Sequence, residues 1–162
     1  MPFVEAFLRV DLKVKEYCTL PYPDHPRGCP NYGMRACCPP EAPVIHDVMD
    51  MDRPVFLVWS AFDLAAHVEK MMSKHPSWSY RQAACCLYWQ GTARNALMET
   101  VNEVERGLYL QGQRPKSLMI PEALGIDVCL MMKEFAGIEL EWPPRNLVYK
   151  VAVIQGVCTS DD

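Results

Sequence analysis

The chain has 162 residues, of which 50% are apolar and 22% are charged, as is typical of a soluble globular protein. Its 16 Lys and Arg against 20 Asp and Glu give a net charge of −4 without any basic run, so nucleic acid is not indicated as a main partner. No stretch approaches the roughly 18 apolar residues of a membrane helix, and the N-terminus lacks the features of a secretory signal. We therefore expect a single domain, residues 1–162, that is cytoplasmic and not bound to a membrane.

The first half of the chain predicts two strands and a helix. Apolar and charged residues alternate from Leu8 to Lys15, which is typical of a strand with one exposed face. A short helical turn is expected over residues 44–51. The apolar run PVFLVWSAF at 54–62 predicts a strand buried on both faces, and Asp63 is a suitable N-cap for a helix over 64–75.

The second half predicts more helix and a last strand. One long amphipathic helix is expected from Ser79 to about Arg106, with a break near Gly91 as the alternative. Residues 107–117 predict a loop or a short strand, and Pro121 begins a helix that ends at Gly137. A buried strand follows over 146–157, and the tail 158–162 is expected to be loose.

Strands separated by helices, without repeats or a long linker, predict an α+β or α/β fold. We expect helices packed on a small mixed sheet of three or more strands.

The most unusual segment is residues 18–40, CTLPYPDHPRGCPNYGMRACCPP, called the cysteine loop below. It contains four of the eight cysteines and several of the 14 prolines, and it has no apolar periodicity. Because such a segment has no packing reason to be ordered, a metal centre or disulfides must hold it. The adjacent cysteine pairs disfavour disulfides and favour thiolates used in metal or redox chemistry.

The candidate metal ligands are Cys18, Cys29, Cys37 and Cys38. Their C-x10-C-x7-C-C spacing matches neither a zinc ribbon nor a bacterial ferredoxin, so it predicts a metal without identifying it. Successive side chains diverge in an extended backbone, so only one of the adjacent pair is expected to be a ligand. Cys18, Cys29 and Cys38 are then the three main ligands, and Cys37 is a nearby thiol.

Three thiolates can hold two kinds of metal centre. One is a zinc ion completed by His25, His46 or a distant cysteine. The other, which we favour, is an iron–sulfur cluster of the [4Fe–4S] type with one open iron, which could bind a substrate oxygen or sulfur as a Lewis acid.

For the other cysteines and for Arg94, the sequence mainly predicts structural roles. Cys85, Cys86, Cys129 and Cys158 are expected to be small buried hydrophobic residues. Arg94 lies where the apolar stripe of the long helix is stretched, so it is either an anion anchor or an arginine extended to solvent.

The motif CPNYGMRACCPP resembles a family of predicted metal-binding proteins, the domain of unknown function 2284, found largely in anaerobic bacteria and archaea. Members carry a cysteine, then C-P-x-Y-G and C-P-P, which fall here on Cys18, residues 29–33 and residues 38–40. The segments ALMETVNEVERGLYLQG and RPKSLMIPEALGIDV also resemble family segments. The interval after Cys18 is longer than usual and no second cysteine-rich run occurs at 108–114, so the resemblance implies a short member.

Three functions stay open at this point. The first is an iron–sulfur or zinc protein of redox or anaerobic cofactor metabolism, with a redox or metabolic partner protein. The second is a non-catalytic interaction module with a structural zinc. The third is a thiol redox protein that uses Cys37 and Cys38, or Cys85 and Cys86.

Overall fold

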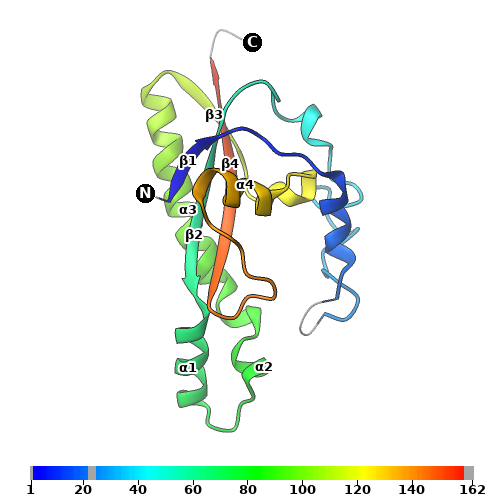
Figure 1. Ribbon diagram of the computed structural model, residues 1–162, viewed down its shortest axis with the longest axis vertical. Coiled ribbons are helices and arrows are strands. Elements are labelled where there is room, and N and C mark those ends of the chain that lie inside the picture. Colours follow the sequence, from blue (N-terminus) through cyan, green and yellow to red (C-terminus); the bar gives the residue numbers. More distant parts are fainter. Residues whose placement is uncertain (1, 22–24, 159–162) are drawn as a thin grey trace.

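The computed structural model describes residues 2–21 and 25–158. Its sheet has the strand order β1-β2-β4-β3, with β1 at Phe3–Ala6, β2 at Val55–Asp63, β3 at Gln113–Leu118 and β4 at Leu147–Cys158 (Figure 1). Helices pack on this sheet, so the predicted single α+β domain is confirmed.

All neighbouring strands are antiparallel, so the expectation of a mixed sheet was wrong. Helix α3 (Gln90–Leu110) returns the chain along the sheet, and β2 and β3 consequently run in the same direction. However, β4 pairs with both of them and separates them. The parallel strands β2 and β3 are therefore not hydrogen-bonded to each other.

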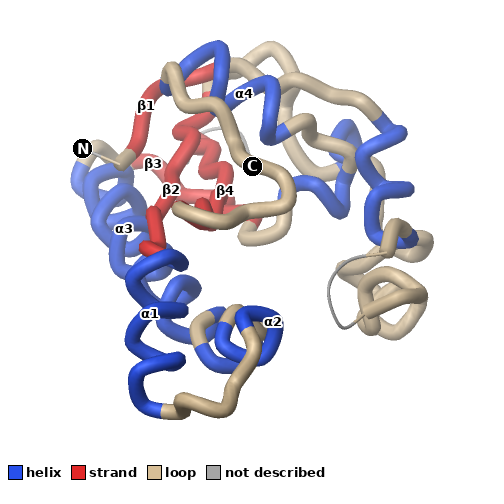
Figure 2. Tube along the Cα trace, turned by 60° about the horizontal axis from the view of Figure 1, so that its bottom comes forward, coloured by secondary structure: helices blue, strands red, loops and turns tan. Residues whose placement is uncertain are grey.

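One face of the sheet is covered by α3. The buried side chains of Leu97 and Val101 on this helix pack with Val58 of β2 and with Ala152 and Ile154 of β4. Figure 2 shows α3 on one side of the strands and α4 (Val128–Ala136) on the other. This burial on both sides explains why the two central strands are nearly continuous apolar runs.

The opposite face is covered by α4 and by the segment that follows the cysteine loop. Met131 and Met132 of α4 pack with Leu57 and Val153 of the central strands. Ile45, in the short 3-10 helix η2 (Ile45–Asp47), is fully buried in the same cluster. The predicted helical turn over 44–51 is thus a 3-10 turn that closes this face.

The predicted long helix from Ser79 is divided in three. It forms α2 (Tyr80–Ala83), the 3-10 helix η3 (Cys86–Tyr88) and α3. The indole Nε1 of Trp89 donates to the Ala84 carbonyl at 3.0 Å, an acceptor that a continuous helix would pair with a backbone N–H. The break therefore lies before Gly91. Helix α1 (Leu64–Lys74) follows β2 with Asp63 as its N-cap, as predicted.

The predicted strand over residues 8–15 was also wrong. Residues Leu12–Thr19 form a 3-10 helix, η1, because the Asp11 side chain caps it by accepting from the Lys13 N–H at 3.0 Å.

The predicted helix from Pro121 is interrupted as well. It begins as the 3-10 helix η4 (Pro121–Leu124), and Gly125 in a left-handed conformation (φ 91°) separates this helix from α4. Residues 159–162 of the tail that was expected to be loose lie outside the described residues. In the part of the chain that is described, no helix has the length and apolar character needed to cross a bilayer.

Candidate metal centre

The cysteine loop is attached to the sheet through the turn between η4 and α4. The Asp11 N–H donates to the Gly125 carbonyl at 2.9 Å, and the Asp127 N–H donates to the Arg9 carbonyl at 2.8 Å. Glycine is favoured at position 125 by its left-handed conformation (φ 91°), and a Cβ there would lie 2.8 Å from the end of the Leu12 side chain. The G-I-D-V segment of the sequence thus fixes the start of η1, which leads into the loop.

The backbone brings Cys29 next to Cys18. The Cys29 N–H donates to the Cys18 carbonyl at 2.7 Å, although ten residues separate the two cysteines. Gly28 makes this approach possible, because its φ is 82° and a Cβ there would collide with the Cys18 carbonyl oxygen and with Thr19. The long interval between the first two cysteines is therefore folded back on itself.

A second set of turns returns the chain with Cys38. The Tyr32 N–H donates to the Cys29 carbonyl at 3.1 Å, and the Gly33 N–H donates to the Pro39 carbonyl at 2.7 Å. The Ala42 N–H then donates to the Cys38 carbonyl at 2.9 Å. The loop is held by backbone hydrogen bonds of this kind, since none of its described residues belongs to a hydrophobic core cluster.

The thiols of Cys18, Cys29 and Cys38, called the thiol triad below, interact electrostatically in all three pairs. Burial raises the pKa of the Cys18 thiol, and the negative charges of Cys29, Cys38 and Glu122 raise it further. Burial also raises the pKa of Cys38, with additional contributions from Cys37 and Cys29. Mutual repulsion of this kind disfavours thiolates in the absence of a cation and is relieved when a cation binds between them.

The thiol triad is not arranged around a single ion. Among residues 2–21 and 25–158, no group of three or more His, Cys, Asp or Glu side chains could hold one metal ion. Each thiol of the triad is half-buried, whereas the Cys37 side chain is exposed. The Cys37 and Cys38 side chains are hydrogen-bonded to each other.

The predicted alternative ligands differ in their exposure. His46 is exposed on η2, and His25 is half-buried in the loop. The charged groups that shift the pKa of Cys18 and Cys38 include neither histidine.

The cysteines outside the loop have different surroundings. Cys129 and Cys158 are exposed, so the expectation that they are buried hydrophobic residues was wrong. Cys86 is half-buried in η3. Cys85 lines a pocket of about 320 Å³ together with Trp78, Arg81, Gln82 and Tyr88.

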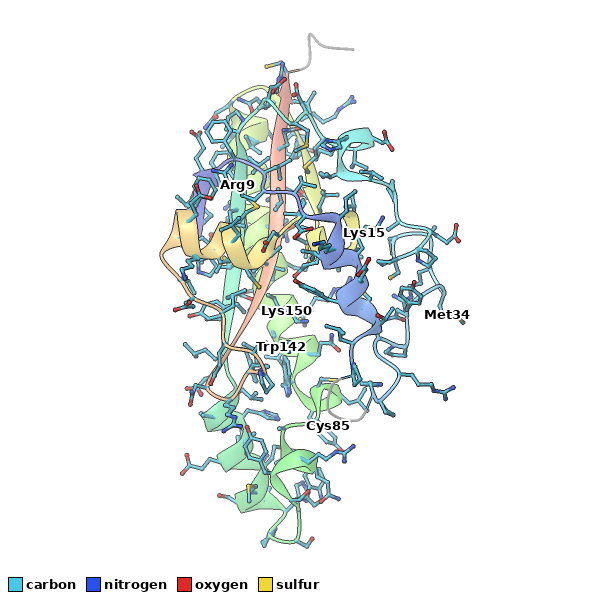
Figure 3. The ribbon with its side chains drawn as sticks, turned by 45° about the vertical axis from the view of Figure 1, so that its right-hand side comes forward. Arg9, Lys15, Met34, Cys85, Trp142 and Lys150 are labelled. Atoms are coloured by element: carbon cyan, nitrogen blue, oxygen red, sulfur yellow. The ribbon has the colours of Figure 1, made fainter. Side chains whose placement is uncertain are left out.

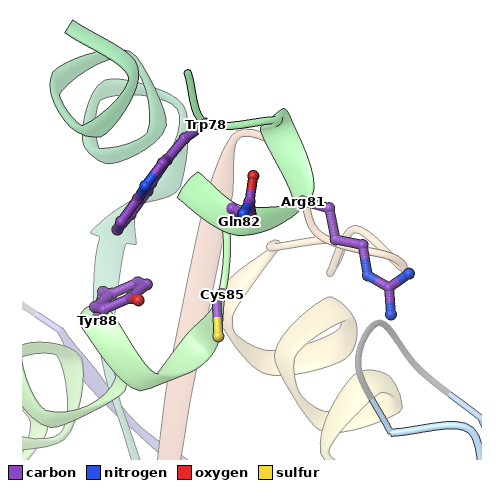
Figure 4. A pocket seen from close by; sticks show the side chains of 5 residues that line it. All are labelled: Trp78, Arg81, Gln82, Cys85 and Tyr88. Carbon is purple, nitrogen blue, oxygen red and sulfur yellow. The ribbon is translucent and has the colours of Figure 1, made fainter. Parts of the chain in front are cut away.

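Figure 4 shows that this pocket is formed by α2, η3 and the turns beside them, with Arg81 extending away from the two aromatic rings. The rings of Trp78 and Tyr88 lie 5.2 Å apart between centroids. No residue of the cysteine loop lines it among those described, so Cys85 belongs to a separate surface feature.

Two charged residues near the thiol triad were not identified in the sequence. Glu122 of η4 is accessible to solvent, yet protein surrounds its carboxyl group closely enough that burial raises its pKa. Lys150 of β4 interacts with the Glu122 charge. The sequence could have pointed to Lys150, because it is the one charged residue in the apolar segment VYKVAVI.

Comparison of the chain with the models of known protein families, with curated proteins and with solved structures finds no match.

Proposed function

We propose that Cys18, Cys29 and Cys38 bind an iron–sulfur cluster of the [4Fe–4S] type, and that the protein acts in redox or anaerobic cofactor metabolism in the cytoplasm. The observation that carries this proposal is the backbone hydrogen bond from Cys29 to Cys18 together with the turns that return the chain to Cys38. Burial and the charges of neighbouring thiols also raise the pKa of Cys18 and Cys38. Backbone hydrogen bonds hold the three cysteines near one another in a loop whose described residues belong to no hydrophobic cluster. Cys37, exposed beside Cys38, is a neighbouring thiol in this arrangement.

A cluster and a single zinc ion place different demands on the thiol triad. Four sulfurs around one zinc lie about 3.8 Å apart, because each Zn–S bond is about 2.3 Å long. An iron–sulfur cluster contains several metal atoms, and its ligands are spread more widely. A site of three thiols fits the cluster without a fourth protein ligand, whereas a structural zinc ion needs one.

Such a cluster supplies one-electron chemistry and, at an iron without a protein ligand, a position for a substrate atom. The chain's own contribution is to hold three thiolates at one side of η4, close to Glu122. The surrounding charges and burial would then set the stability of the oxidised and reduced states.

A zinc centre with a structural role is the second candidate, because the cysteine loop needs some fixed point. A zinc ion would require the loop to contract around it and to recruit a fourth ligand such as His25. A colourless protein with one zinc per chain would favour this function.

Serine variants purified without oxygen test the proposal. Cys18→Ser, Cys29→Ser and Cys38→Ser are each expected to lose most of the bound iron and the visible absorption, because a hydroxyl is a poor ligand for iron in a cluster. Cys158→Ser removes an exposed thiol at the end of β4 and is the matched control, which should keep both. Iron content that is equal in all four variants would contradict the proposal.

A further inference from the structure

Lys150 is a charged residue in an otherwise uncharged strand. It lies in β4 opposite Ser60 of β2, so the two side chains are on the same face of the sheet, the face that α3 covers. The Ser60 hydroxyl donates to the Ala93 carbonyl of α3 at 3.0 Å, which places the next helical residue, Arg94, near the same position. Lys150 is half-buried and Arg94 is exposed.

Neither cation has a close partner among the described residues. No hydrogen bond or ion pair is formed there by the Lys150 ammonium or by the Arg94 guanidinium. Three groups act on Lys150 through their charge: Glu122, Cys86 and Arg94 itself. Two cations near one carboxylate leave an excess of positive charge, and a half-buried ammonium without a partner is unfavourable for the fold.

The region beside Lys150 is open on one side. Strand β3 pairs only with residues 153–158 of β4, so residues 147–152 have no strand partner on that edge in the described chain. Lys150 is labelled in Figure 3, and its side chain is half-buried. The partial exposure of Lys150 and the exposure of Arg94 leave both side chains in contact with solvent.

Glu122 connects this region to the thiol triad. Its charge acts on Cys18 on one side and on Lys150 on the other. Lys150 and Cys18 of the thiol triad therefore interact with a common carboxylate. Arg and Lys are the usual partners of carboxylates and phosphates, since both present charged N–H donors.

We propose that Lys150 and Arg94 bind the oxyanion group, a carboxylate or a phosphate, of a small molecule that lies beside the thiol triad. Its role as a substrate of the metal centre rests on the proposed function, whereas oxyanion binding by these two residues does not. Burial lowers the pKa of Lys150, and a bound anion would reverse this effect by stabilising the ammonium.

Titration calorimetry of the full chain, with citrate and with inorganic phosphate at constant ionic strength, tests the proposal. Saturable binding of citrate, of phosphate or of both is expected, and the preferred probe identifies the oxyanion. Lys150→Met and Arg94→Gln should each weaken it about tenfold or more. The matched controls are Lys116→Met on β3 and Arg106→Gln on α3, both exposed, which should bind like the unchanged protein.

Two further variants distinguish binding from a structural role. Glu122→Gln should tighten binding severalfold, because it removes the competing carboxylate. Lys150→Met should raise the melting temperature without anion by about 2 °C or more, because it removes a half-buried charge. A structural role for Lys150 predicts the opposite shift.

Measurements on metal-free and on reconstituted protein distinguish the metal-centre proposal from the oxyanion proposal. Cys29→Ser should lose the visible absorption yet keep oxyanion binding, and Lys150→Met should show the reverse. The oxyanion proposal would be overturned if neither probe bound saturably, or if Lys150→Met bound as the unchanged protein does. Either result leaves the iron measurement to decide the metal centre on its own.

Discussion

Gly28 is the residue on which the position of Cys29 depends most directly. Its left-handed conformation and its missing side chain allow the chain to pass against the carbonyl of Cys18. Gly33 shares the left-handed conformation (φ 68°), but no atom lies within 4 Å of the place where its Cβ would be. Replacing Gly33 by alanine therefore adds only the free-energy cost of a left-handed backbone. Replacing Gly28 adds the same cost and a steric collision.

Gly28→Ala is expected to reduce iron binding strongly and to destabilise the loop. Both alanine variants carry the roughly 1–2 kcal/mol cost of a left-handed non-glycine residue. Only the variant at Gly28 adds a collision with backbone atoms, which must shift Cys18 or Cys29. Iron content per chain, compared between Gly28→Ala and Gly33→Ala, measures the difference. Equal losses would show that the close approach is unimportant.

Glu122 makes the stability of the metal-free protein depend on pH. Burial raises its pKa above the ordinary value of 4.5. A carboxyl group with a raised pKa favours the folded state fully below about pH 4.5, and this contribution is lost as the pH rises through the raised value. Lys150 counteracts the shift through its positive charge, and Cys18 and Cys129 respond to the same carboxylate.

Glu122→Gln should therefore increase the free energy of unfolding at pH 7, and the increase should disappear as the pH falls toward 4.5. Urea unfolding of the metal-free protein between these pH values measures it. Asp127 on the neighbouring turn caps α4, so Asp127→Asn is a control that alters another carboxylate nearby. A gain for Glu122→Gln that does not change with pH would contradict the assignment.

Strand β4 also holds the segment that returns from the cysteine loop. Gln155 is 2% exposed, and its side chain accepts from the Asp50 N–H at 3.0 Å and donates to the Asp50 carbonyl at 2.8 Å. The amide thus satisfies both backbone groups of one residue.

Gln155→Leu should lower the free energy of unfolding by about 2–4 kcal/mol, because two backbone groups lose their partners. Chemical denaturation measures this loss. Gln111→Leu, at an exposed position after α3, is the control and should change stability little. A similar small effect for Gln155→Leu would show that water replaces the amide without cost.

The elements that the sequence predicted correctly are those whose pattern reflects burial alone. The apolar runs of β2 and β4 follow from their position between α3 and α4. The segment from Leu8 failed as a strand prediction because its backbone pairs with residues near Gly125, far away in the sequence. The break at Ala84 depends on one indole hydrogen bond, which no periodicity reveals.

The candidate site was predictable only in part for a similar reason. The cysteines of the thiol triad stand out because their loop has no apolar periodicity in the sequence. Glu122 and Lys150 lie on η4 and β4, and only the folded sheet brings their charges together. The spacing of residues in one segment cannot show such an approach between distant elements.

The molecule as a whole separates a packed sheet from a loop without a core. The hydrophobic clusters form on both faces of the strands and around α1 and α2, while the described part of the cysteine loop stands beside them (Figure 2). A hydrogen bond from Lys15 Nζ to the Ala42 carbonyl, 2.9 Å long, joins the segments that precede and follow the loop. A bound metal centre would therefore order the loop while leaving the sheet nearly unchanged.

The most direct test of the metal centre is the amount of iron and acid-labile sulfide in protein isolated without oxygen. A [4Fe–4S] cluster held by the thiol triad predicts about four of each per chain, together with a broad visible absorption. Protein that contains zinc without sulfide, or that contains no metal after anaerobic reconstitution, would contradict it.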